Sequence, residues 1–126
     1  MALTVTVSQL NMYVKSVLTS DPNLKGVTVR GEISNYTRNA RSGHAYFTLK
    51  DSSAAVNCVM FSSACSKVKF DVSDGLEVFV TGSVALYERD GAYQLYAEKM
   101  TPVGIGAAYL AFLQLKEKLE KTGLFA

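Results

Sequence analysis

The chain has 126 residues, of which 48% are hydrophobic and 19% charged, which is enough for one domain with a sizeable core and too little for several domains. Its longest apolar run, residues 107–113, is far too short to span a membrane, and no secretory leader begins the chain, so we expect a cytoplasmic protein with no membrane contact. A formal net charge of +2 does not by itself indicate a nucleic-acid-binding protein, so the distribution of charge matters more than its total.

The thiols and the imidazole form no metal-binding motif. Cys58, Cys65 and the single histidine, His44, show neither C-x-x-C nor H-x-x-x-H spacing. A structural zinc site needs four nitrogen or sulfur ligands. We therefore expect no metal site, no cofactor and no disulfide framework, with both thiols reduced.

The first predicted element is a helix over residues 8–19, where apolar side chains recur at helical spacing. Ser8 is its expected N-cap. The polar residues 20–23, which include a proline, end it.

Two-residue alternation of apolar and polar side chains predicts five strands after this helix. They cover residues 27–34, 44–50, 56–61, 76–86 and 93–100. Gly31 is expected to bend the first strand or to form a bulge in it. A short helical turn is predicted over residues 64–70, a hairpin turn at residues 89–91, and a last helix over residues 107–121.

This order of elements predicts a mainly β protein. The favoured architecture is a five-stranded OB-fold Greek-key barrel with an N-terminal helix and a C-terminal linking helix. An open five-stranded sheet packed against two helices is the alternative.

No arrangement of side chains indicates catalysis. His44 has no neighbouring carboxylate in the sequence, and the acidic residues are scattered over turns and strand ends. The glycines lack the spacing of a dinucleotide-binding or P-loop motif. We therefore expect no catalytic residue in this chain.

Charge is distributed unevenly along the chain. Residues 25–50 contain five basic residues and one acidic residue, whereas residues 71–90 contain five acidic residues and one arginine. The pattern predicts a basic side and an acidic side of the barrel. A basic stripe over two neighbouring strands and their loop suits a phosphate backbone, and it coincides with the usual binding surface of an OB fold.

Aromatic side chains are interleaved with these basic ones. If Val29, Ile33 and Phe47 face the interior, the residues between them face outward, where rings can stack on unpaired bases. The predicted nucleic-acid-binding residues are Arg30, Tyr36, Arg38, Arg41, His44, Tyr46, Lys50, Asn57, Phe61 and Arg89. Neither predicted helix has a basic face suited to a duplex groove, so a single strand is the favoured ligand.

Several segments in order resemble the N-terminal domain of the exodeoxyribonuclease VII large subunit. They are residues 29–35 (VRGEISN), 42–51 (SGHAYFTLKD), 59–61 (VMF) and 91–96 (GAYQLY), followed by the tail at residues 115–119 and 123–125. The resemblance implies an OB-fold domain that binds single-stranded DNA, with binding roles for Arg30, Arg38, Arg41, Tyr46, Lys50 and Asn57.

The same resemblance implies that DNA binding and catalysis belong to separate domains. Residues 1–103 are expected to form the binding domain, and residues 104–126 a helix that leads to a catalytic domain absent from this chain. The family cuts single-stranded DNA from either end into oligonucleotides and joins a small helical subunit, so this fragment is expected to bind DNA without cleaving it.

Two other functions stay open at this stage. One is a protein-interaction barrel, in which the apolar seam of the last helix, with Phe112 and Leu115, docks a partner or a second copy of the chain. The other is a transfer-RNA anticodon-binding barrel, which shares the fold and a similarly placed aromatic residue.

Overall fold

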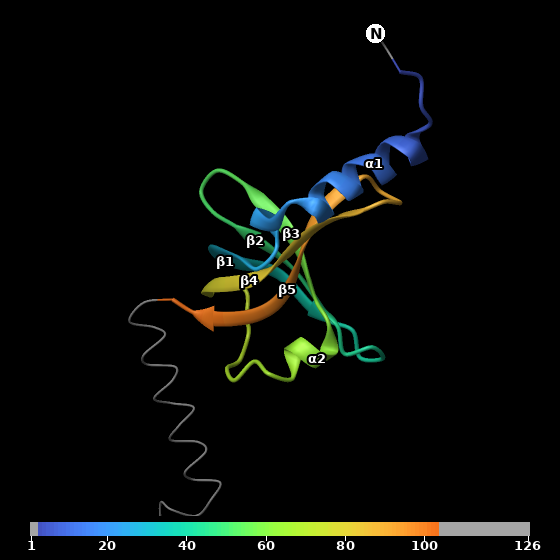
Figure 1. Ribbon diagram of the computed structural model, residues 1–126. Coiled ribbons are helices and arrows are strands. Elements are labelled where there is room, and N and C mark those ends of the chain that lie inside the picture. The colour runs from blue at the N-terminus through green and yellow to red at the C-terminus, as the bar shows by residue number, and fades with distance from the viewer. Residues whose placement is uncertain (1–2, 104–126) are drawn as a thin grey trace, which may run out of the picture.

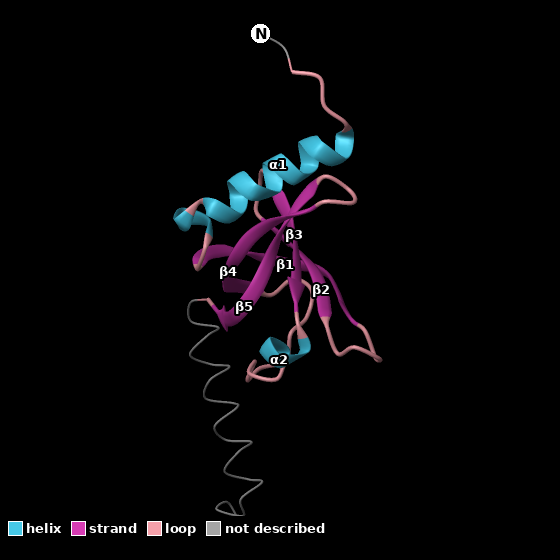
Figure 2. Cartoon of the chain, turned by 45° about the vertical axis from the view of Figure 1, so that its right-hand side comes forward, coloured by secondary structure: helices cyan, strands magenta, loops and turns pink. Residues whose placement is uncertain are grey.

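The computed structural model describes residues 3–103. Its elements, in chain order, are α1 (Val7–Ser20), the 3-10 turn η1 (Pro22–Leu24), β1 (Val27–Arg38), β2 (Ala45–Lys50), β3 (Ala55–Met60), α2 (Ser62–Cys65), β4 (Glu77–Tyr87) and β5 (Ala92–Pro102). Figure 1 shows α1 lying across one end of the strands and α2 near the other end. Figure 2 shows the strands gathered between these two helices.

The strands form a closed barrel in the order β1-β2-β3-β5-β4. The barrel closes because β1 pairs with both β2 and β4. The pairing is antiparallel except between β3 and β5, which run parallel with Cys58 opposite Leu95 and Val59 opposite Tyr96. The mainly β, OB-type barrel predicted from the sequence is therefore confirmed, and the open sheet is excluded.

Helix α1 begins one residue earlier than predicted, and Ser8 is not its N-cap. Thr6 is the N-cap: its hydroxyl oxygen accepts a hydrogen bond from the Gln9 amide at 3.1 Å, while the Gln9 side chain accepts one from the Thr6 amide at 2.9 Å. This reciprocal capping box satisfies two helix-end donors at once. Ser8 is already inside the first turn, because the helix begins at Val7.

The predicted bulge lies further along β1 than Gly31. The register of β1 against β2 shifts between Ser34 and Thr37, and Asn35 there has a φ of 54°. Gly31 instead allows β1 to approach β2 closely, because a Cβ at this position would lie 2.8 Å from Leu49 Cγ and 3.0 Å from the Lys50 carbonyl oxygen.

The helical turn predicted over residues 64–70 is shorter and earlier than expected, at Ser62–Cys65. The Phe61 carbonyl oxygen accepts hydrogen bonds from the Ala64 and Cys65 amides, both at 2.9 Å. Beyond this turn the chain is irregular, because Val68 and Phe70 pack against the barrel core instead of continuing a helix.

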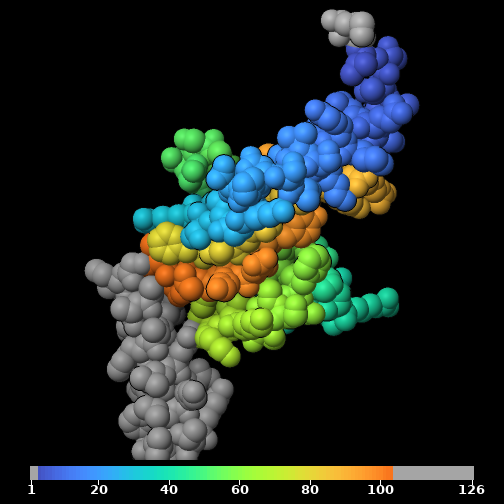
Figure 3. Space-filling view, viewed as in Figure 1, coloured from blue at the N-terminus to red at the C-terminus, as the bar shows by residue number. Residues whose placement is uncertain are grey.

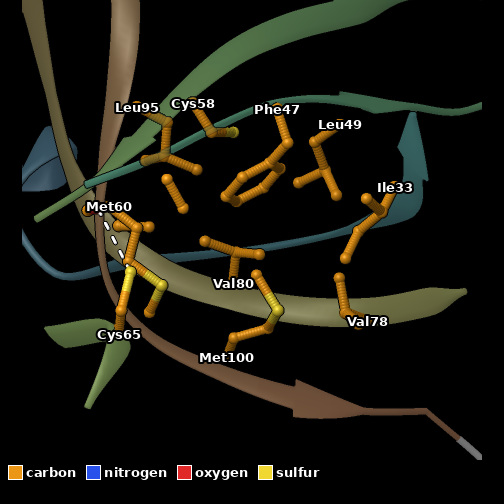
Figure 4. Close-up of a cluster of buried hydrophobic side chains, with 12 residues drawn as sticks. Ile33, Phe47, Leu49, Cys58, Met60, Cys65, Val78, Val80, Leu95 and Met100 are labelled. Carbon is orange, nitrogen blue, oxygen red and sulfur yellow. Dashed lines mark hydrogen bonds between the residues drawn. The ribbon is translucent and has the colours of Figure 1, made fainter. Parts of the chain in front are cut away.

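The core fills the interior of the barrel with side chains from all five strands and from α2 (Figure 4). Ile33 and Phe47, both predicted to face inward, are at most 3% exposed, as are Leu49 and Cys58. Burial of an aliphatic or aromatic side chain of this size contributes about 1.5–3 kcal/mol. Burial also raises the pKa of the Cys58 thiol to about 12, so this cysteine behaves as a small apolar side chain.

Within residues 3–103, no helix is both long enough and apolar enough to cross a membrane. The helix predicted over residues 107–121 and its apolar seam lie outside the described residues.

Candidate nucleic-acid interface

The outer surface of three neighbouring strands brings aromatic and amide side chains together. Tyr46 lies opposite Val59, and Val59 lies opposite Tyr96, so the three residues form a line across β2, β3 and β5. Thr48 lies opposite Asn57 one pleat further along. We call this surface the β2–β3–β5 face; its members are Tyr46, Thr48, Asn57, Val59, Gln94 and Tyr96.

Three rings follow one another at one end of this face. The His44 and Phe61 ring centroids lie 5.0 Å apart at an interplanar angle of 77°, and the Phe61 and Tyr96 centroids lie 6.0 Å apart at 25°. We call these three residues the aromatic row. Phe61 is 48% exposed and the nearby Tyr46 44% exposed, so both rings offer flat apolar faces to solvent.

His44 has a positioning role in this row. The Ser62 amide donates a hydrogen bond to His44 Nδ1 at 2.9 Å, so this nitrogen is an acceptor and the neutral ring carries its proton on Nε2. The bond ties the start of β2 to the start of α2 and turns the His44 ring edge-on to Phe61.

A hollow of about 250 Å³, lined by both polar and apolar residues, lies beside Tyr46. Asn35, Asn57 and Gln94 bring side-chain amides to it. The Thr48 hydroxyl donates to Asn57 Oδ1 at 3.3 Å, which leaves the Asn57 amino group as a donor toward solvent. Amide side chains both donate and accept, as the edges of nucleobases do.

Sequence reasoning missed three residues of this site, namely Asn35, Gln94 and Tyr96. Alternation places Gln94 and Tyr96 on the same side of β5, but only the parallel pairing of β5 with β3 brings that side next to Tyr46 and Phe61. Asn35 reaches the hollow because the β1 bulge turns it there.

Two of the predicted arginines lie at the turn from β1 to β2: Arg38 ends β1, and Arg41 lies in the loop over residues 39–44. The Arg38 Nε group donates to the Gly43 carbonyl oxygen at 3.1 Å, and Asn39 Oδ1 accepts from the Arg41 and Ser42 amides at 2.8 and 3.1 Å. Within residues 3–103 neither arginine forms a salt bridge. Both guanidinium groups are exposed at this loop, where anions can reach them.

The predicted separation into a basic and an acidic side is wrong. Arg30 Nε lies 2.6 Å from Glu77 Oε1, and its guanidinium lies 5.9 Å from the centre of the Phe79 ring. Glu77 belongs to the acidic stretch, and barrel closure sets β4 beside β1. Lys50 Nζ likewise lies 3.4 Å from Glu32 Oε2. Two of the predicted binding cations are thus neutralised by carboxylates of the same barrel.

Tyr36 was predicted to face outward and instead turns toward the core. Its ring centroid lies 6.0 Å from that of Phe47, and burial raises the pKa of its hydroxyl. The bulge between Ser34 and Thr37 shifts the alternation of β1 by one residue. Tyr36 therefore closes one end of the barrel and is not part of the β2–β3–β5 face.

Arg89 lies in the turn between β4 and β5, which α1 holds in place. The Asn11 side-chain amide donates to the Glu88 carbonyl oxygen at 2.8 Å, and Lys15 Nζ lies 2.7 Å from Glu88 Oε1. Figure 1 shows this turn beneath α1. Glu88 is thus engaged by α1, while Arg89 stays exposed and forms no salt bridge within residues 3–103.

The structure brings together His44, Tyr46, Asn57 and Phe61 from the predicted set, and places Arg30 and Tyr36 elsewhere. In the described part of the chain, no three His, Cys, Asp or Glu side chains gather closely enough to hold a metal ion.

Comparison with known proteins identifies the family of this chain. A family model described as an OB-fold nucleic acid binding domain matches residues 5–101. The chain is 54% identical over 120 residues to the exodeoxyribonuclease 7 large subunit of Brevibacillus brevis, covering 95% of this chain and 26% of that protein. It is 54% identical over 122 residues to the protein of the same name from Natranaerobius thermophilus, covering 97% and 29%.

Those relatives confirm the resemblance found in the sequence, and the chain spans less than a third of their length. Among solved structures, a chain of a replication protein A heterotrimer bound to ssDNA superposes with a TM-score of 0.53 at 15% identity, covering 77% of this chain and 74% of that one. At this identity the likeness supports the fold alone. The barrel topology and the match over residues 5–101 together show that this chain belongs to the family of OB-fold nucleic acid binding domains.

Proposed function

We propose that this domain binds single-stranded DNA on its β2–β3–β5 face, as the DNA-binding domain of an exodeoxyribonuclease VII large subunit. The observation that carries the proposal is the exposure of two rings: Phe61, in the aromatic row, and Tyr46, beside a hollow that amide residues line. The names of the relatives, at 54% identity, support the choice of enzyme.

Each part of the site has a role in this proposal. Unpaired bases stack on Tyr46 and Phe61, and base–aromatic stacking contributes about 1–3 kcal/mol per base. The amides of Asn57 and Gln94 bond to base edges in the hollow. Arg41 and Arg89, on loops beside the face, contact phosphates.

A single strand fits this surface better than a duplex does. In a duplex the faces of the bases are stacked on one another. The exposed rings of Tyr46 and Phe61 therefore find no free base face to stack on. Duplex readers place a basic helix in the major groove. The one basic residue of α1, Lys15, is bonded to Glu88.

The remainder of the function is assigned to parts of the relatives that this chain does not span. In our proposal the strand passes from this domain to a nuclease domain in the same polypeptide, in the cytoplasm, and a small helical subunit joins the assembly. The same proposal assigns contact with that subunit, or self-association, to the segment over residues 107–121, which lies outside the described residues.

Titration of a fluorescent single-stranded DNA of about 14 nucleotides, at low and at high salt, tests the proposal. We expect binding at low salt that weakens as salt rises, and a loss of roughly 5- to 150-fold in Tyr46→Ala, which corresponds to 1–3 kcal/mol. Tyr13→Ala is the matched control, because Tyr13 is an exposed tyrosine on α1.

Three results contradict the proposal: no binding at low salt, binding that is indifferent to salt, or equal losses in the two tyrosine variants. A matched RNA strand is run in parallel. Tighter binding of RNA than of DNA would instead indicate a site that uses the 2′-hydroxyl.

A further inference from the structure

A second groove lies next to the aromatic row, between the segment that follows β3 and the last part of β5. Residues 61–68 form one wall and residues 97–101 the other, and the groove has a volume of about 520 Å³. Ala64, Val68, Ala97 and Met100 give it an apolar lining. Figure 3 shows these two segments in contact, the first in lime green and β5 in orange.

Phe61 belongs to both surfaces. Its ring stacks on Tyr96 in the aromatic row, and the same side chain lines the groove. The aromatic row and the groove are therefore continuous at Phe61, and one ligand can contact both.

The charges at this groove differ from those around Arg30 and Lys50. Lys67 and Lys99 stand on opposite walls, both exposed, and neither forms a salt bridge within residues 3–103. Glu98 is the one acidic residue of the lining, so the groove carries a net charge of about +1 from these three groups. An anionic ligand is favoured over a neutral apolar one.

We propose that this groove is a second nucleotide-binding subsite, which takes the single strand after it has crossed the aromatic row. A base packs on the apolar lining against Phe61, and the flanking phosphates contact Lys67 and Lys99. The volume lies within the range of pockets that hold small-molecule ligands, about 300–1,000 Å³, and suits a nucleotide. This inference rests on the proposed function, because it extends the path of the same strand.

Oligonucleotide length provides the test. Strands of about 4 and about 14 nucleotides, near the lower and upper limits of the usual range for one OB fold, are titrated against the wild type, Lys67→Ala and Lys99→Ala. Each phosphate contact to a single strand changes the slope of log K against log[salt] by about 0.7. At about 0.1 M salt we therefore expect each variant to bind the long strand about fivefold more weakly and the short strand unchanged. Lys25→Ala, which removes an exposed lysine remote from the groove lining, is the matched control.

The outcomes separate the subsite from the proposed function. If both lysine variants match Lys25→Ala on the long strand, or lose as much on the short strand as on the long one, the subsite is disproved. Binding by the wild type that still depends on Tyr46 then leaves the proposed function standing. If the wild type binds neither strand at low salt, both proposals are overturned together.

Discussion

The two sides of the barrel use similar residues for different purposes. On the side formed by β1 and β4, Arg30 is paired with Glu77 and lies over the Phe79 ring. On and beside the β2–β3–β5 face, the rings of Tyr46 and Phe61 are exposed, and Arg38 and Arg41, at the β1–β2 loop, form no salt bridge within residues 3–103. A carboxylate on a neighbouring strand competes with a ligand for an exposed basic residue of a sheet.

The largest expected difference concerns Phe61 and Phe79, the two exposed phenylalanines of residues 3–103, which are 48% and 37% exposed. Phe61→Ala removes a stacking ring, so we expect affinity for a 14-nucleotide DNA to fall by roughly 5- to 150-fold. Phe79→Ala, on the β1–β4 side, is expected to change affinity less than twofold. Fluorescence anisotropy measures both, and equal losses would show that the two sides do not differ in function.

A smaller difference is expected between two arginines. Arg41→Ala removes an unpaired cation on the β1–β2 loop, so at about 0.1 M salt affinity should fall about fivefold and the salt slope by about 0.7. Arg30→Ala removes a cation that Glu77 already neutralises, and we expect a change of less than twofold.

The two arginine variants can also show that the two sides of the barrel do not differ in DNA binding. If Arg30→Ala weakens binding as much as Arg41→Ala does, the β1–β4 side takes part in binding, as the sequence had suggested. Thermal unfolding of both variants provides the control, because an exposed ion pair such as Arg30–Glu77 contributes only about 0.2–1 kcal/mol to stability.

Features of the structure that depend on neighbouring residues in the sequence are predicted well, and features that depend on residues far apart in the sequence are not. The strand at residues 45–50 is predicted almost to the residue, because its alternation is unbroken. Tyr36 is misplaced because the bulge at Asn35 interrupts the alternation of β1. A non-glycine residue with positive φ leaves no mark in a hydrophobicity pattern.

Long-range pairing accounts for the other differences. Glu77 reaches Arg30 only because β4 closes the barrel against β1, and Tyr96 joins the site only because β5 runs parallel to β3. Local patterns predict strands but not their neighbours, so the charge balance of a face and the full membership of a site depend on the topology. His44 illustrates the same point, since its partner, the Ser62 amide, is 18 residues away.

The smallest expected effect concerns Asp51, in the turn between β2 and β3. Its carboxylate accepts hydrogen bonds from the Ser53 and Ala54 amides at 2.8 and 2.9 Å, and these bonds hold the pKa of Asp51 below its ordinary value. A carboxyl group whose pKa is lowered by folding stabilises the folded state above its ordinary pKa, near 3.9, and this contribution is lost as the pH falls through the lower folded value. Asp51→Asn keeps an acceptor oxygen but removes the charge.

We therefore expect Asp51→Asn to unfold more readily than the wild type in urea at pH 7, with the difference shrinking as the pH is lowered below about 4. A difference that stays constant or grows at low pH would contradict this assignment. Asp51 lines the same hollow as Arg30, Glu32 and Glu77, so affinity for DNA should not change in the variant. Lost stability with unchanged affinity would place Asp51 with the charges that hold the barrel together, whereas a loss of affinity would extend the binding face into the β2–β3 turn.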